Sequence, residues 1–245
     1  MNRNTRLAQI FIGAMVLAAA ASAIYAGIDS YTLHPAQAAA LLALAAATSR
    51  MKVNLPGITG NMSVNLPFLL IAVISLSAVE ATAIVCLSTV LQSLPKPGNK
   101  IKPEQLLFNV SMMGFAAHLA GLIWHAASQV KAVRASDPLM LALTTAVFFV
   151  GQTAAVAAIV TLTEGGLMRR TWLNIAQLSF PYYMVGAGVA AIMASVSHSL
   201  GWRVTLAVFP VMYAIHRSYR VYFAETDRDT GQRLVTDAAI SVVAI

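Results

Sequence analysis

Hydrophobic residues in this chain lie in long, nearly unbroken runs separated by short polar stretches. The runs cover residues 8–28, 36–50, 64–95, 105–127, 138–162, 173–198 and 203–223. A helix that crosses a bilayer needs about 20 mostly apolar residues, and most of these runs approach or exceed that length. The pattern therefore predicts an all-α integral membrane protein with short connections.

The run at 64–95 differs from the others because it is too long for one simple crossing. Its roughly 32 residues would form a helix of about 48 Å, whereas the hydrocarbon core is about 30 Å thick. It is either one steeply tilted helix or two short helices joined near residues 77–80. Each half has only about 16 residues, so a re-entrant pair is allowed if neighbouring helices shield its turn.

The basic residues decide between these two arrangements. With one crossing and a cytoplasmic N-terminus, seven of the 16 basic residues are cytoplasmic, which is no bias. With two crossings, only Lys131, Arg134 and Arg203 lie outside, so thirteen of the 16 basic residues are cytoplasmic. The positive-inside rule favours the second arrangement. We expect about eight transmembrane segments, with the third and fourth forming a short, crossing or re-entrant hairpin and both termini cytoplasmic.

Composition supports a membrane protein and excludes several other classes. Hydrophobic residues make up 58% of the chain and charged residues only 10%, against roughly 25% charged in soluble domains. A soluble enzyme, a disordered linker and a fibrous repeat are excluded. The net charge of +7 fits basic cytoplasmic loops, and we expect no nucleic-acid partner because no basic patch with interleaved aromatics lies outside a run.

The two ends of the chain suggest one membrane domain and a short tail. We expect residues 1–223 to form the membrane domain and 224–245 a cytoplasmic tail too short for its own core. Arg3 and Arg6 precede a first run that ends in small residues, as in a cleavable signal peptide. Its length and the runs that follow favour a retained signal-anchor helix.

Signatures of soluble enzymes, cofactor sites and metal sites are missing. The sequence has no glycine-rich phosphate loop, no paired metal-ligand cysteines and no nucleophile elbow. His118 and His125 lie seven residues apart, about 10.5 Å along a helix, which is too far to share one metal ion. We expect neither catalysis, nor a metal, nor a cofactor.

A few polar groups at bilayer depth are the candidates for function, because such groups are rare and costly there. Glu80 is the only carboxylate well inside a run, and it has two interpretations: an N-terminal helix cap, or a contact for a ligand, proton or cation. His118 could face it. Asn109, Gln152, Asn174 and Gln177 more often bridge helices through hydrogen bonds. If the chain binds a small molecule, the expected contacts are Glu80, Asn65, Asn109 and His118.

Four stretches resemble a known family in the order of their polar, proline and glycine positions. They are Lys52–Gly57, Gly60–Asn65 with the segment reaching Glu80, Gln105–Ser111 and Pro210–Tyr222. Together they resemble the multi-pass N-terminal membrane region of bacterial diguanylate cyclases and HD-GYP cyclic-di-GMP phosphodiesterases, over most of residues 50–223. The resemblance implies a sensory input module in a bacterial inner membrane, whose last helix continues into a cytoplasmic output domain.

Two departures from that family change what the resemblance implies. Val79 stands where the family places a proline before the hairpin glutamate, and residues 224–245 carry no GGDEF or HD-type signature. If the protein ends at Ile245, the resemblance implies the input half alone, without an enzymatic activity.

The leading hypothesis is a membrane module that passes a small-molecule or membrane signal to a cytoplasmic output protein. Pro210 would flex the last helix, while Arg217, Tyr219 and Arg220 would set its depth at the interface. The expected partners are the lipid bilayer, that output protein and a second copy of the chain. The alternative is a small-solute transporter or substrate-binding membrane subunit, because transporters place binding groups at broken short helices.

Overall fold

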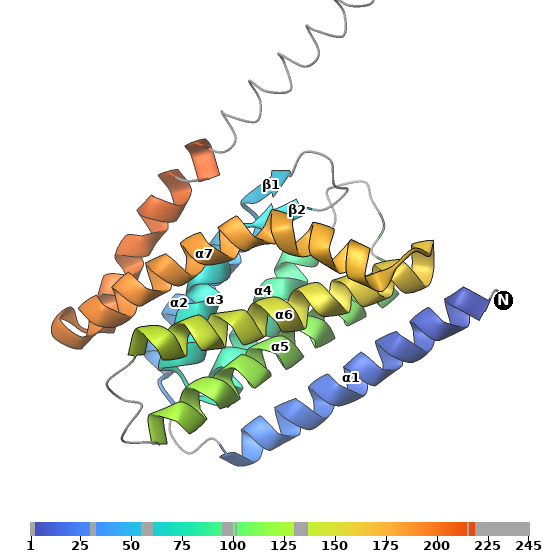
Figure 1. Ribbon diagram of the computed structural model, residues 1–245. Coiled ribbons are helices and arrows are strands. Elements are labelled where there is room, and N and C mark those ends of the chain that lie inside the picture. The colour runs from blue at the N-terminus through green and yellow to red at the C-terminus, as the bar shows by residue number, and fades with distance from the viewer. Residues whose placement is uncertain are drawn as a thin grey trace, which may run out of the picture.

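The computed structural model describes residues 3–29, 33–54, 61–94, 100, 102–129, 137–214 and 216–218. Its helices are α1 (Arg3–Asp29), α2 (Pro35–Ser49), α3 (Leu66–Ser75), α4 (Ala78–Ser93), α5 (Pro103–Gln129), α6 (Asp137–Glu164) and α7 (Met168–Leu200). The 3-10 helix η2 (Trp202–Ala207) leads into helical residues 208–214 and 216–218. Two strands, β1 (Lys52–Asn54) and β2 (Asn61–Ser63), follow α2 and precede α3 along the chain, and they lie next to each other (Figure 1).

Four of these helices are long and apolar enough to cross a membrane. The qualifying stretches are Asn4–Ile28 of α1, Pro103–Ala126 of α5, Pro138–Glu164 of α6 and Met168–Ser197 of α7. Helices α2, α3 and α4 are apolar but shorter. The prediction of an all-helical membrane protein is confirmed in this coarse form, apart from the small β-ladder.

The long apolar run breaks into two antiparallel helices, α3 and α4, close to the position that the sequence predicts. α3 ends at Ser75 and α4 begins at Ala78. Near the start of α3, the Asn65 Nδ2 atom donates to Ser88 Oγ of α4 at 2.9 Å. Asn65 stands just before the start of α3, whereas Ser88 is ten residues after Ala78, in the second half of α4. The start of one helix therefore lies near the end of the other, so the two helices run in opposite directions.

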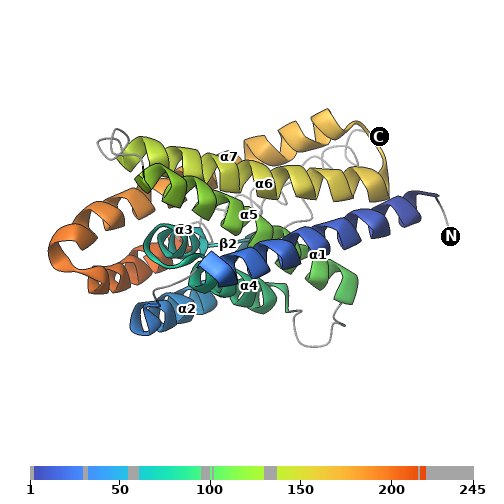
Figure 2. The same cartoon turned by 90° about the horizontal axis from the view of Figure 1, so that it is seen from below.

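Contacts between ring systems and polar groups give the directions of the other helices. The ring centroids of Phe11 and Phe108 are 6.1 Å apart, and those of Tyr25 and His118 are 5.9 Å apart. Because residue numbers rise together in the two pairs, α1 and α5 run in the same direction. Hydrogen bonds between α4 and α5 show that these two helices are antiparallel. A hydrogen bond and a ring contact show the same for α6 and α7. α5 and α6 lie side by side in both views, joined at one end (Figures 1 and 2).

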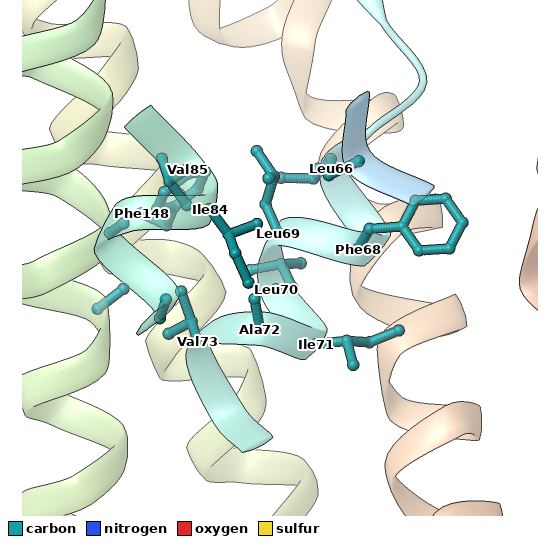
Figure 3. Close-up of a cluster of buried hydrophobic side chains, with 14 of the residues drawn as sticks. Leu66, Phe68, Leu69, Leu70, Ile71, Ala72, Val73, Ile84, Val85 and Phe148 are labelled. Atoms are coloured by element: carbon teal, nitrogen blue, oxygen red, sulfur yellow. The ribbon is translucent and has the colours of Figure 1, made fainter. Parts of the chain in front are cut away.

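The short helix α3 lies at the centre of the bundle. It packs against α2, α4, α5 and α7, and Figure 2 shows it nearly end-on among its neighbours. A helix that is apolar on every side is typical of a fully enclosed position. Figure 3 shows labelled side chains of α3 pointing to several sides of the helix. Its buried residues are Leu66, Pro67, Phe68, Leu69, Leu70, Ile71, Ala72 and Val73.

The antiparallel ladder of β1 and β2 is a feature that the sequence analysis did not predict. Lys52 pairs with Ser63 and Asn54 with Asn61. The N–H of Val64 then donates to the carbonyl of Met51 at 3.2 Å. Strands of three residues carry too little alternation to stand out in a sequence. The ladder brings the end of α2 close to the start of α3.

Gly186 allows α7 to approach α3, and enlarging it should destabilise the fold. A Cβ atom there would lie 2.7 Å from Leu66 Cδ2 and 3.0 Å from Leu66 Cγ, and Leu66 is itself buried. We expect Gly186→Ala to lower the free energy of unfolding by about 1–3 kcal/mol through overpacking. Denaturant titration in detergent measures this change.

Gly188, two residues further along α7, provides the matched control. A Cβ atom there would meet nothing within 4 Å. Gly188→Ala should therefore leave stability unchanged or raise it slightly, because alanine is the better helix former. Equal stability of the two variants would refute the close α3–α7 contact.

Candidate functional site

Glu80 takes part in a reciprocal cap at the start of α4. Ser77 is the N-cap residue, and its Oγ accepts from the Glu80 N–H at 3.4 Å. In return, Glu80 Oε2 accepts from the Ser77 N–H at 3.3 Å and from Ser77 Oγ at 2.8 Å. This capping box satisfies backbone donors that have no partner within the helix.

The other oxygen of Glu80 reaches a second helix. Glu80 Oε1 accepts from the backbone N–H of His34 at 2.6 Å, and His34 is the N-cap residue of α2. One carboxylate therefore lies at the N-terminal ends of both α2 and α4, where helix dipoles favour negative charge. These hydrogen bonds are the ones expected if Glu80 is an N-terminal helix cap. A ligand contact at Glu80 stays a prediction.

Asn65 lies in a buried polar chain that links three helices. It is the N-cap residue of α3, is only 4% exposed, and its Nδ2 donates to Ser88 Oγ of α4. Ser88 Oγ in turn donates to the carbonyl oxygen of Ala45 in α2 at 3.4 Å. At the same level, Tyr182 Oη of α7 accepts from the Leu66 N–H at 3.0 Å.

Asn109 and His118 lie on α5 and contact different helices. Asn109 Nδ2 donates to Ser93 Oγ at 3.5 Å, which is the helix-bridging role expected of it. His118 is 5% exposed, and its ring lies edge-on to the Tyr25 ring of α1. In these contacts, each of the four candidate residues has different neighbours.

The spacing along α4 shows that Glu80, Asn65 and Asn109 do not form one compact site. Ser88 and Ser93, which contact Asn65 and Asn109, are eight and thirteen residues beyond Glu80. At 1.5 Å per residue these steps are about 12 Å and about 20 Å. Within the described residues, no group of three His, Cys, Asp or Glu side chains could hold a metal ion.

Sequence reasoning missed three polar residues around these candidates. Ser77 could have been found, because serine three residues before Glu80 is the spacing of a capping box. His34 and Tyr182 act only through their place in the fold, and no local pattern announces either contact.

An open groove of about 460 Å³ lies between α1 and α5, near the start of α5. Its walls are mostly apolar, with two polar residues among them. The lining residues are Gln9, Ile12, Gly13, Val16, Leu17, Glu104 and Leu107.

The predicted output helix is partly described. Pro210 lies in helical residues 208–214 with its side chain exposed, and Arg217 is helical and exposed. Tyr219, Arg220 and the predicted tail 224–245 lie outside the described residues.

No protein family, curated protein or solved structure matches this chain. The resemblance to membrane regions of cyclic-di-GMP enzymes therefore rests on the residues that carry it.

Proposed function

We propose that the chain is a membrane-embedded input module of a bacterial inner membrane, whose last helix passes a signal to a cytoplasmic partner. The observation that supports the proposal is the alternation of helix directions: α1, α5 and α7 begin at one end of the bundle, and the helical residues after η2 turn back from the far end of α7 (Figure 1). Exposed basic residues mark the end where α1 begins: Arg6, Arg50, Lys100, Lys102, Arg169 and Arg170. The positive-inside rule makes such an end cytoplasmic.

The last helix is suited to relay a movement because one stripe of it rests on the bundle. Val208, Met212 and His216 are buried at four-residue intervals, while Tyr213 and Arg217 are exposed. Val208 and Met212 belong to the same buried cluster as the side chains of α3. A change in packing within this cluster would therefore reach the last helix through its buried stripe.

Reporter fusions after Ile245 test the sidedness on which this proposal depends. A reporter that is active only in the cytoplasm should be active, and one that is active only outside should be silent. The reverse result would refute the proposed output direction.

A register test asks whether the last helix transmits a signal. A diguanylate cyclase domain is fused after residue 223, and one to four alanines are inserted after Ser218. Each alanine rotates the following helix by about 100°. We expect cellular cyclic-di-GMP to vary about fivefold or more with the insertion, in phase with the helical repeat. Constant output across the series would make the region a passive anchor and contradict the proposal.

Transport of a small solute is the second candidate, and the hairpin of α3 and α4 favours it. Two short helices meet at Ser77–Glu80 inside a bundle, an arrangement that transporters use at binding sites. Solute uptake into vesicles that is lost on Glu80→Gln, with the fold preserved, would support transport over relay.

A further inference from the structure

The outward side of α7 carries two side-chain amides among exposed apolar residues. Its exposed positions recur at three- and four-residue steps along the helix and form one face, which we call the α7 outer face. The residues of this face are Asn174, Gln177, Leu178, Pro181, Met184, Val185, Gly188, Ile192 and Ser195.

Two side-chain amides on this face belong to the stretch of α7 that is long and apolar enough to cross a membrane. Gln177 is seven residues beyond Arg170, about 10.5 Å further into the span, and Asn174 is four residues beyond it. Neither amide has a hydrogen-bond partner in the described part of the chain. Leaving an amide unpaired in an apolar medium costs several kcal/mol, so a polar partner is needed.

Helix α1 shows what a lipid-facing surface looks like in the same molecule. Both helices are largely uncovered, with 11% of the α1 span buried and 17% of the α7 span. The exposed residues along the middle of α1 are apolar: Ile10, Leu17 and Ile24 are 67%, 72% and 66% exposed. Lipid is sufficient to cover α1, whereas the α7 outer face also requires hydrogen-bonding groups.

Gly188 lets another helix approach this face closely. The space beyond it is open, since an added Cβ would meet nothing within 4 Å. Gly186 faces the opposite way, toward Leu66 of α3. Small residues at membrane helix surfaces permit backbone approach and close packing.

We infer that the α7 outer face is a dimer interface that pairs with the same face of a second copy of this chain. A carboxamide is self-complementary, because it carries two N–H donors and an acceptor oxygen. A two-fold axis along the membrane normal brings residues of equal depth together, so Gln177 meets the Gln177 of the second copy. The same axis pairs the two Asn174 side chains, and both amides are then satisfied.

Cysteine cross-linking of the full chain in its native membrane tests the interface. In a Cys86→Ala background, which removes the only cysteine, Met184→Cys should give a disulfide-linked dimer on mild oxidation. Leu17→Cys on α1 is the control and should stay monomeric. Equal cross-linking at both positions, or a Met184→Cys product that contains a different protein, would overturn the inference.

Substitutions on the outer face should weaken the dimer without affecting the fold. We expect Asn174→Leu combined with Gln177→Leu to raise the dimer dissociation constant on the order of tenfold, through the lost interhelical hydrogen bonds. Gly188→Leu should weaken association further by blocking close approach, whereas Gly27→Leu on α1, which is also in open space, should not. Single-molecule photobleaching in vesicles counts the copies. A wild-type chain that is monomeric over the full range of protein-to-lipid ratios would refute the inference.

Discussion

Truncating Leu70 to alanine is expected to lower the free energy of unfolding by about 3–5 kcal/mol. Leu70 is fully buried in the middle of α3. Deleting its three carbon atoms removes dispersion contacts on all sides and leaves a cavity. In a bilayer the lost packing is the main cost, because lipid tails solvate a leucine as well as the protein interior does.

The cavity should remain open because α3 cannot move to fill it. It packs against α2, α4, α5 and α7, so collapse toward one helix would open space at another. The cost of a large-to-small change depends on how far the site can relax. We therefore expect the upper part of the usual range for leucine to alanine.

Leu17 is the matched control for this experiment. It is 72% exposed on α1, so the same truncation removes atoms that touch lipid or detergent. Leu17→Ala should change stability by less than about 0.5 kcal/mol. Unfolding in mixed micelles gives both values. Similar losses for Leu70→Ala and Leu17→Ala would show that α3 is not the packed centre of the bundle.

Charge patterning predicted the most informative part of this fold. Hydropathy alone left residues 64–95 ambiguous, but the distribution of lysine and arginine favoured an additional reversal of the chain. The structure places that reversal between Ser75 and Ala78. Loop charge carries this information because it reports on sidedness, which the apolar residues themselves do not encode.

Contacts between segments far apart in sequence could not be predicted in the same way. The bond from the His34 N–H to Glu80 joins residues 46 positions apart, and no local pattern specifies it. Asn174 and Gln177 were expected to bridge helices, yet both lie on the exposed face of α7. A polar residue in a span predicts a hydrogen-bond partner, but it does not say whether that partner belongs to the same chain.

Replacing Glu80 with alanine should produce the second large loss of stability, about 2–4 kcal/mol. The change removes the acceptor for the Ser77 N–H and for the His34 N–H. A lost cap costs about 0.5–2 kcal/mol, and hydrogen bonds to a charged group about 1.5–3 kcal/mol. Glu104→Ala is the control: Glu104 is exposed in the first turn of α5, so its removal should cost at most about 1 kcal/mol.

A double-mutant cycle with Ser77 separates the cap from any binding role of Glu80. If Glu80 and Ser77 stabilise α4 as one unit, Ser77→Ala should cost little once Glu80 is alanine, and the coupling should reach about 0.5–2 kcal/mol. The bond to His34 lies outside that pair, so it should persist in Ser77→Ala and keep α2 joined to α4. A contact made only with a ligand would give a different pattern: Glu80→Ala would leave the unfolding of the ligand-free protein unchanged, and its effect would emerge only when solute is added. Because both carboxylate oxygens already accept from protein donors, we expect the cap pattern.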